Sequence, residues 1–428
     1  MPVPVTPLLI NPVRHALTGP HVAVPASRSV ANRELVLSAV ANGVSRLDLG
    51  GYDPGDDVRA MCGALVALGY DVRSDGPGAA RVAGSATPPP PRGVVDARMS
   101  GTVARFVTVL AALGGEPVRI DGAERLRQRP IGPLARALRD LGATVEGEHL
   151  PLLVRGPLTG GAVVVPGNES SQFASALLLS GPRMRDGLDL RLAGSTVNAP
   201  FIELTAASLQ ARGVRVDRPS ADRFVVGHQR VRARSTSVAG DVITATYPAA
   251  AGAILGGEVT IDNVDARVVT GGQGDARFFD VLERMGCTVR RTASSVTVRR
   301  VGALSGVRAD LRDFADSFPT LAVVAAVAEG PTEISGIGYT RRHESDRIAS
   351  VAAGLRALGA GAEELADGLR IDPPPHLHGG TVSAAGDHRV AMAFAVLGLQ
   401  VPGVVIDDPD CVAKTFPGFF DLLGRLTR

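Results

Sequence analysis

Six segments of the chain are mostly apolar and rich in small side chains. These segments are residues 32–40, 103–113, 173–179, 249–255, 321–328 and 390–399. A helix that is apolar on all sides lies in a core rather than at a surface. The pattern therefore predicts six buried helices, one in each of six repeats of roughly 71 residues.

A second, amphipathic helix ends at a regularly spaced glycine in five of these repeats. The glycines, with the residue before each, are Leu68-Gly69, Leu141-Gly142, Arg212-Gly213, Met285-Gly286 and Leu358-Gly359. They are separated by 73, 71, 73 and 73 residues, and glycine is favoured just after the end of a helix. Alternating apolar and polar residues follow, as in 144–146 with 152–154 and 288–290 with 296–298, which predicts pairs of strands.

Each repeat therefore ends in helix, glycine, strand, turn and strand. A period this long predicts a βαβ-type module rather than a short solenoid repeat. The sixth repeat reaches its buried helix without strands after it, and segments 7–10 and 22–24 could supply them. We therefore expect an α/β protein of two domains, with residues 1–22 plus 240–428 in one domain, closed by both termini, and residues 23–239 in the other.

The six buried helices are expected to begin at matching places, spaced by 72, 70, 73, 73 and 71 residues. These places are Ser29, Gly101, Ser171, Thr244, Ser317 and His388. The N–H groups at a helix start carry partial positive charge and can bind anions. Ordinary capping by Ser and Thr explains any single start. Six starts in register, several beside an arginine, favour a site for a highly anionic ligand.

The charge balance narrows the possible partners. The formal net charge is +2, and the 45 cationic residues are 44 arginines and a single lysine, Lys414. No basic arm or stripe is visible and aromatic residues are few, so we expect no nucleic-acid partner. Three dispersed cysteines lack metal-binding spacing and fit a reducing compartment. Because no leader-like or membrane-spanning apolar run occurs, we expect a soluble, cytoplasmic protein.

Charged residues gather near the expected helix starts and in a few further strings. They are Arg28, Arg33, Arg105, Arg129, Asp316, His343, Glu344, Asp346, Arg347, Asp387, Arg389 and Lys414. Arginine binds carboxylate and phosphate through paired hydrogen bonds, whereas lysine is a compact point charge. Two carboxylates among such cations, Asp316 and Glu344, are therefore candidates for acid–base work on an anionic substrate. The sequence contains no P-loop, dinucleotide-binding or metal-binding string.

At these same positions the sequence resembles the EPSP synthase family, over about Val24 to Phe420. The resemblance rests on Ser170-Ser171-Gln172-Phe173, Arg129-Pro130-Ile131, Glu344-Ser345-Asp346-Arg347, Asp387-His388-Arg389 and Ala413-Lys414-Thr415-Phe416-Pro417. It implies a two-domain inside-out α/β barrel of six βαβαββ repeats, three per domain, with the substrates held between the domains. It also implies enolpyruvyl transfer from phosphoenolpyruvate to the 5-hydroxyl of shikimate 3-phosphate, without metal or cofactor. We expect the enzyme to act as a monomer.

The resemblance also implies roles for individual residues. For phosphoenolpyruvate they are Arg28, Gly101, Arg129, Gln172, Arg347, Arg389 and Lys414. For shikimate 3-phosphate they are Arg28, Ser29, Arg33, Ser170, Ser171, Gln172, Asn198, Asp316 and His343. The resemblance further implies Asp316 as base toward the hydroxyl, Glu344 as proton partner of the methylene carbon, and Arg28 between both substrates. The division of the two proton transfers stays open.

The chain departs from the family pattern mainly where the acceptor is expected. Arg28 stands for a usual lysine, and Arg98 for a common glycine. Asn198 and Phe201 stand where a serine and an aromatic or histidine are usual. The alternatives are therefore a paralogue acting on another phosphorylated alcohol, such as a nucleotide or sugar phosphate, and an anion-binding homologue without catalysis. The cell-wall relative that acts on UDP-N-acetylglucosamine is disfavoured, because residues 123–128 lack its cysteine.

Overall fold

The computed structural model describes residues 6–76 and 78–427, and within them the chain forms two compact units. The terminal unit comprises the chain up to Pro25, Ala239–Val269 and the chain from Gln273 onward. The middle unit comprises Ala26–Val238 and the short segment Thr270–Gly272. Both units combine helices with mixed β-sheets, which confirms the predicted α/β class.

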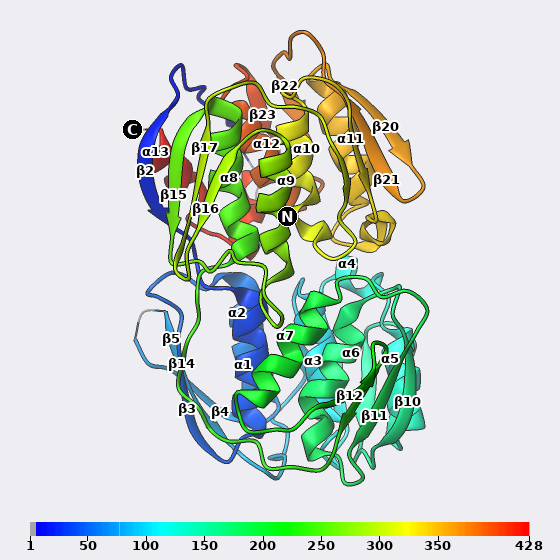
Figure 1. Cartoon of the computed structure of the whole chain (residues 1–428). Helices are drawn as coiled ribbons and strands as arrows, with labels where there is room; N and C mark the ends of the chain where they lie inside the picture. Colours follow the sequence, from blue (N-terminus) through cyan, green and yellow to red (C-terminus); the bar gives the residue numbers. More distant parts are fainter. Residues whose placement is uncertain (1–5, 77, 428) are drawn as a thin grey trace. The chain divides into compact units, whose positions relative to one another are not determined.

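In the middle unit, three buried helices contact one another and form the core (Figure 1). They are α1 (Arg28–Val40), α3 (Gly101–Ala111) and α6 (Ser171–Ser180). Three four-stranded sheets lie around them. In spatial order the strands are β14 (Thr236–Ser237), β3 (Gly43–Asp48), β5 (Ala79–Gly84) and β4 (Asp71–Ser74); β6 (Val95–Asp96), β7 (Val118–Asp121), β9 (Leu152–Arg155) and β8 (Thr144–Glu146); and β10 (Gly161–Pro166), β11 (Leu188–Ala193), β13 (Arg223–Val226) and β12 (Asp217–Ser220).

The terminal unit repeats this plan with its own core helices. These are α8 (Val242–Leu255), α10 (Phe318–Ala325) and α12 (His388–Gly398), which also contact one another. The strands around them, in spatial order, are β16 (Thr288–Arg291), β17 (Ser295–Arg300), β15 (Gly257–Asp262) and β2 (Leu17–Ala23); β18 (Arg308–Asp310), β19 (Thr332–Ser335), β21 (Gly368–Asp372) and β20 (Gly361–Leu365); and β1 (Leu8–Leu9), β23 (Val404–Ile406) and β22 (Gly380–Val382). The six predicted buried helices are therefore all present.

The amphipathic helices of the repeats lie beside the strands and end at the predicted glycines. These helices are α2 (Gly55–Ala67), α5 (Gly132–Asp140), α7 (Pro200–Gln210), α9 (Arg277–Arg284) and α11 (Arg347–Ala357). The glycines after them have φ of +94°, +97°, +81°, +108° and +93°, a backbone conformation that side chains disfavour. The remaining short elements are α4 (Glu124–Arg127), α13 (Phe419–Leu426), η1 (Gly181–Arg183), η2 (Gly274–Ala276), η3 (Ala315–Ser317), η4 (Gly338–Arg342) and η5 (Pro409–Lys414).

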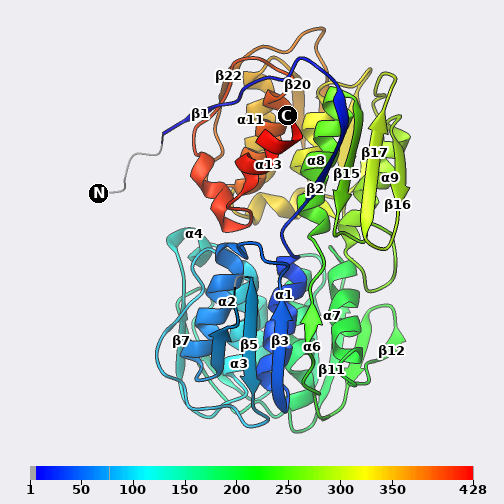
Figure 2. The ribbon, with the colours of Figure 1, turned by 90° about the vertical axis from the view of Figure 1, so that its left-hand side faces the viewer.

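The two N-terminal strands do not both complete the sixth repeat, as the sequence had suggested. Strand β1 does, because Leu8 and Leu9 pair antiparallel with Ile406 and Val405 of β23. Strand β2 instead pairs in parallel with β15 and completes the sheet of the α8 repeat (Figure 2). In the middle unit, β14 pairs with β3 although β14 precedes α8 in sequence. The strand before α1 and the strand before α8 therefore join each other's repeats, which a local pattern does not reveal.

The starts of the buried helices fall at or within two residues of the predicted places. Helices α3, α6 and α12 begin at the predicted residue, whereas α1 begins one residue earlier, α8 two earlier and α10 one later. Four of these helices have a side-chain cap. Ser27, Ser100, Ser170 and Asp387 each stand just before a helix and accept a hydrogen bond from a backbone N–H of its first turn.

Candidate active site

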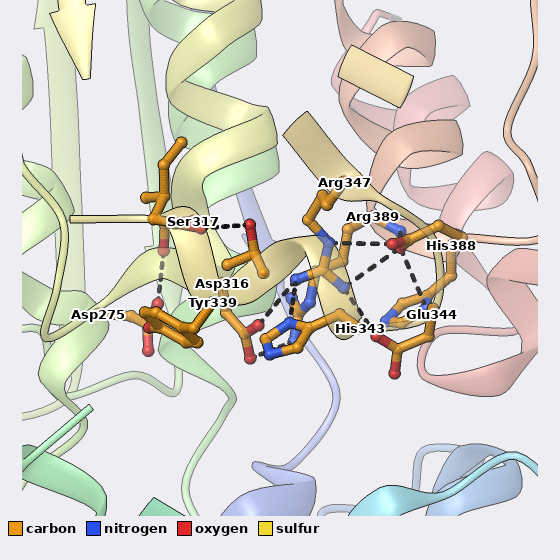
Figure 3. A network of polar contacts seen from close by, with 12 residues as sticks. Asp275, Asp316, Ser317, Tyr339, His343, Glu344, Arg347, His388 and Arg389 are labelled. Carbon is orange, nitrogen blue, oxygen red and sulfur yellow. Dashed lines mark hydrogen bonds and ion pairs between the residues drawn. The ribbon is translucent and has the colours of Figure 1, made fainter. Parts of the chain in front are cut away.

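Arg347 is the centre of a buried ion-pair network in the terminal unit (Figure 3). It is the first residue of α11, and only 1% of its surface is exposed. Its Nε donates to Asp387 Oδ2 at 2.9 Å, and its Nη1 to Asp316 Oδ1 at 3.0 Å. Its Nη2 donates to Glu344 Oε2 at 2.9 Å, while Nη1 and Nη2 also lie near His343 Nδ1 and Asp387 Oδ1. Protein acceptors thus occupy all the donor positions of this guanidinium.

Asp316 joins Arg347 to a second buried arginine. Asp316 lies in η3, just before α10, and its Oδ2 accepts from Arg389 Nη2 at 2.9 Å. Arg389 stands in the first turn of α12, where its backbone N–H donates to the cap residue Asp387 at 3.0 Å. The network therefore connects the starts of α10, α11 and α12, and those of α10 and α12 are two of the six helix starts where the sequence predicted an anionic ligand.

Glu344 joins the same network to the single lysine. Lys414 is the last residue of η5, and its Nζ donates to Glu344 Oε1 at 2.5 Å. The side chains of Lys414 and Glu344 are 12% and 9% exposed, so the pair is largely withdrawn from solvent. Among the described residues Glu344 is the acceptor of Lys414, which leaves ammonium hydrogens for a ligand.

The cations of this network stay charged despite burial. Burial by itself lowers the pKa of Arg347, but attraction to Asp387, Glu344 and Asp316 outweighs it and raises the pKa above the usual range. The pKa of Arg389 is likewise lowered by burial and raised more strongly by Asp316 and other groups. An anionic ligand therefore meets fixed positive charge, and it must displace a protein acceptor where it binds Arg347. A carboxylate that loses its cation gains proton affinity.

Arg33 is a buried cation of the middle unit. It lies on α1 and is 2% exposed. Its Nε donates to Thr205 Oγ1 at 2.8 Å, and its Nη2 donates to Ser175 Oγ at 3.1 Å and the Phe201 carbonyl at 3.0 Å. Its Nη1 donates to the Ser29 carbonyl at 2.8 Å. Among the described residues none of its partners is a carboxylate, and burial lowers the pKa of Arg33 to about 9.

Gly101 and its neighbours form a second group in the middle unit, at the starts of α3 and α6. Arg105 Nη1 donates to Gln172 Oε1 at 2.7 Å, and Arg105 Nη2 donates to the Pro130 carbonyl at 2.7 Å. A Cβ at Gly101 would lie 2.4 Å from Arg105 Nη1 and 3.0 Å from the Arg129 guanidinium. The two arginines therefore approach the helix start closely, and a Cβ at Gly101 would displace the ends of their side chains.

Arg28, the residue that stands for a usual lysine, lies on α1 beside an acidic helix start. Its Nε is 3.8 Å from Asp57 Oδ2, and both side chains are mostly buried. The neighbouring residue, Asp56, lies 3.5 Å from Nη1 of Arg98. Both aspartates belong to the first turn of α2, where the helix dipole favours negative charge.

The remaining predicted residues also lie at helix starts. Ser170 caps α6 and accepts from the Gln172 backbone N–H at 3.2 Å, and Ser171 is the first, buried residue of that helix. Asn198 precedes α7 with a φ of +51°, and its Oδ1 is buried without a hydrogen-bond partner among the described residues. These positions form two groups, one in each unit: the predicted residues up to Asn198 lie in the middle unit, and Asp316 with those after it in the terminal unit.

The structure also brings in residues that the sequence did not single out. Ser175 and Thr205 hold the Arg33 guanidinium, Asp57 faces Arg28, and Asp275 contacts Ser317 beside Asp316. None of these four stands in a recognisable motif. In the sequence, each of them is only a polar residue within or next to a helix. Such residues are too common to identify a site.

Among the residues that the structure describes, no group of His, Cys, Asp or Glu side chains is arranged to hold a metal ion. In the same part of the chain, the helices are too short or too polar to cross a membrane.

Comparison with known proteins gives consistent matches along the chain. The family model "EPSP synthase (3-phosphoshikimate 1-carboxyvinyltransferase)" matches residues 14–423. A protein of Methanosphaerula palustris named 3-phosphoshikimate 1-carboxyvinyltransferase is 41% identical over 94% of this chain and 95% of its own length. A protein of the same name from Mycobacterium ulcerans is 38% identical over 93% of each chain.

Solved structures resemble the whole chain as well. The EPSP synthase of Acinetobacter baumannii has a TM-score of 0.80 at 26% identity, covering 98% of this chain and 97% of its own. The enolpyruvyl transferase NikO of Streptomyces tendae has a TM-score of 0.77 over 99% of this chain and 98% of its own. Its identity is only 20%, so this second likeness establishes the fold alone.

Proposed function

The chain belongs to the EPSP synthase family, and from this premise we propose how its residues carry out the reaction. The enzyme transfers the 1-carboxyvinyl (enolpyruvyl) group of phosphoenolpyruvate to the 5-hydroxyl of shikimate 3-phosphate and releases phosphate. The observation that carries the residue assignment is the network of Asp316 and Glu344 with Arg347, Arg389 and Lys414. It places two carboxylates directly on the cations that would hold the anionic donor.

The reaction needs two proton movements, and each carboxylate is suited to one. In the addition step the hydroxyl oxygen bonds to C2 of phosphoenolpyruvate and loses its proton, while C3 gains one. In the elimination step the C2–O bond to phosphate breaks and C3 gives its proton back. Asp316 accepts the hydroxyl proton, and Glu344 exchanges the proton with C3. When a substrate anion binds Arg389 or Lys414 in place of one of these carboxylates, the proton affinity of that carboxylate rises. This favours the proton transfer assigned to it.

Phosphoenolpyruvate is held by arginines, which form paired hydrogen bonds, and by the compact ammonium of Lys414. In the terminal unit Arg389 and Lys414 have donors to spare, whereas Arg347 must give up a protein acceptor before it can bind the ligand. In the middle unit the donor side consists of Arg28, the Gly101 backbone, Arg129 and Gln172. Fixed charges of this kind also stabilise the charge that develops in the transition state.

Shikimate 3-phosphate is assigned to the middle unit together with Asp316 and His343. Arg33 and Ser29 take its carboxylate, which supplies the negative partner that Arg33 lacks among the described residues. Ser170, Ser171, Gln172 and Asn198 bind its phosphate at the start of α6 and before α7, where N–H groups point toward anions. Arg28 is assigned to both substrates.

A different phosphorylated acceptor is not favoured. Relatives that share the name 3-phosphoshikimate 1-carboxyvinyltransferase reach 35% to 41% identity over almost the full chain. The likeness to NikO lies at 20% identity and concerns the fold. Arg28, Arg98, Asn198 and Phe201 are therefore interpreted as variations within one activity.

The test is phosphate release by the purified chain with phosphoenolpyruvate and shikimate 3-phosphate. We expect turnover, and we expect Asp316→Ala to reduce it by at least ~10³-fold because a positioned base is lost. The matched control is Asp421→Ala, an exposed carboxylate of α13 that should leave the rate unchanged. Absence of turnover at high enzyme concentration, or full activity of Asp316→Ala, would contradict the assignment.

The cellular location, the oligomeric state and the domain bounds are further proposals. We propose a cytoplasmic location, which three unpaired cysteines support. A monomeric state stays a prediction that light scattering tests. The domain bounds 1–22 plus 240–428 and 23–239 also stay a prediction, and limited proteolysis at the two crossings tests them.

A further inference from the structure

Asp275 is a fully buried acid that the assigned mechanism does not use. It lies in η2 and is 0% exposed. Its Oδ1 accepts a hydrogen bond from Ser317 Oγ at 2.6 Å (Figure 3). Its Oδ2 is buried and has no hydrogen-bond partner among the described residues. Ser317 is the chain neighbour of Asp316, so Asp275 is one contact away from the assigned base.

The surroundings of Asp275 disfavour a negative charge on it. A buried charge without a counter-ion costs far more than a buried neutral polar group. Among the described residues, no cation lies within ion-pair distance of Asp275. Arg389, which faces it, pairs with Asp316. Arg277, two residues further along, pairs with Asp313 instead.

The charged and titratable groups that face Asp275 come from several elements and are mostly acidic. They are Asp316 of η3, Asp241 at the start of α8, Tyr339 of η4 and, as the one cation, Arg389 of α12. Burial, and next the like charge of Asp316, raise the pKa of Asp275 to about 7, although the Ser317 hydrogen bond and Arg389 oppose this. Geometry and electrostatics thus agree.

We propose that Asp275 is a positioning residue that works in its protonated form and, through Ser317, holds Asp316 in place against Arg347 and Arg389. In this state Oδ2 carries the proton and Oδ1 accepts from Ser317, which fixes the start of α10. Loss of the proton places a second carboxylate charge beside Asp316 and adds negative charge to a site that binds two anions. The inference rests on the proposed function of Asp316.

The consequence is a pH dependence of substrate binding that Asp275 adds to the one caused by ionisation of the substrates. If the neutral form is the working form, kcat/KM falls by up to about tenfold for each pH unit above the pKa of Asp275. The fall should lie mainly in KM, because the added charge repels anionic substrates. Asp275→Asn replaces the neutral acid by an amide whose oxygen can still accept from Ser317 Oγ, so the fall should be absent in this variant.

The experiment compares kcat and KM of the wild type, Asp275→Asn and Asp280→Asn between pH 5.5 and 8.5. Asp280 is an exposed carboxylate on α9, paired with Arg291, and its variant should keep the wild-type profile. Ionisation of the substrates affects all three proteins equally. A profile of Asp275→Asn that matches the wild type, or a folded Asp275→Asn that is inactive at every pH, overturns the proposal.

A readout without substrates separates this proposal from the assigned activity. The difference between potentiometric titrations of the wild type and Asp275→Asn should contain one proton released near pH 7. If the chain fails to turn over shikimate 3-phosphate, the proposed function fails, yet the titration still reports whether Asp275 is protonated. A difference curve whose proton is released near pH 4 instead refutes the neutral state itself.

Discussion

The buried acid Asp275 should make the stability of the folded chain depend on pH. In the unfolded chain this carboxyl has its ordinary pKa of 3.8, and in the folded chain burial and Asp316 raise the pKa to about 7. The folded state therefore keeps a proton that the unfolded state has already lost in the interval between these values. The perturbation that removes this difference is Asp275→Asn.

The sign and size follow from proton linkage. The stabilising effect of the bound proton is complete below pH 3.8 and is lost as pH rises to about 7, with no further change above. A difference of roughly three pKa units corresponds to about 4 kcal/mol, of which about 2 kcal/mol falls between pH 5 and pH 7, because the folded-state group is still half protonated at its pKa. The variant cannot titrate at this position, so its stability relative to the wild type should rise by that amount over the interval.

Urea unfolding followed by circular dichroism at pH 5, 6, 7 and 8 measures this change. We expect the free energy of unfolding of Asp275→Asn, relative to that of the wild type, to increase from pH 5 to pH 7 and then to stay nearly constant. The exposed variant Asp280→Asn should show less than about 0.5 kcal/mol of change at any pH. A constant difference between Asp275→Asn and wild type from pH 5 to pH 8 would refute the reasoning, because it would mean that Asp275 is ionised throughout.

Three further changes test the substrate sites. Gly101→Ala places a Cβ 2.4 Å from Arg105 Nη1 and 3.0 Å from the Arg129 guanidinium, so the KM for phosphoenolpyruvate should rise at least ~tenfold in steady-state kinetics; an unchanged KM would contradict the contact. Lys414→Arg replaces a compact ammonium, which donates to Glu344 at 2.5 Å, with a larger, planar guanidinium, and kcat/KM should fall ~100-fold. Near-normal turnover would show that any cation suffices. Arg33→Lys loses most of the hydrogen bonds of the guanidinium, so urea unfolding should report a loss of about 2–3 kcal/mol, and a loss below about 0.5 kcal/mol would indicate that the contacts are dispensable.

The sequence by itself determined the features that depend on neighbouring residues. The buried helices follow from their mostly apolar composition, and the glycines at 69, 142, 213, 286 and 359 from the positive φ needed after a helix. The hairpin strands follow from alternation, as at 144–146 and 152–155. Short strings such as Asp387-His388-Arg389 also indicated the family. Each of these features depends on residues that are close together in the sequence, so the sequence alone predicts it.

Only the tertiary structure decided which distant residues meet. The exchange of β2 and β14 between the α1 and α8 repeats rests on pairing between strands more than 180 residues apart. Likewise, the sequence around Arg347 does not indicate that Asp316 and Asp387 accept hydrogen bonds from its guanidinium, or that Asp275 contacts the neighbour of Asp316. Ion pairing and burial are set by proximity in space, and it is burial that turns an ordinary aspartate such as Asp275 into a group that holds its proton near neutral pH.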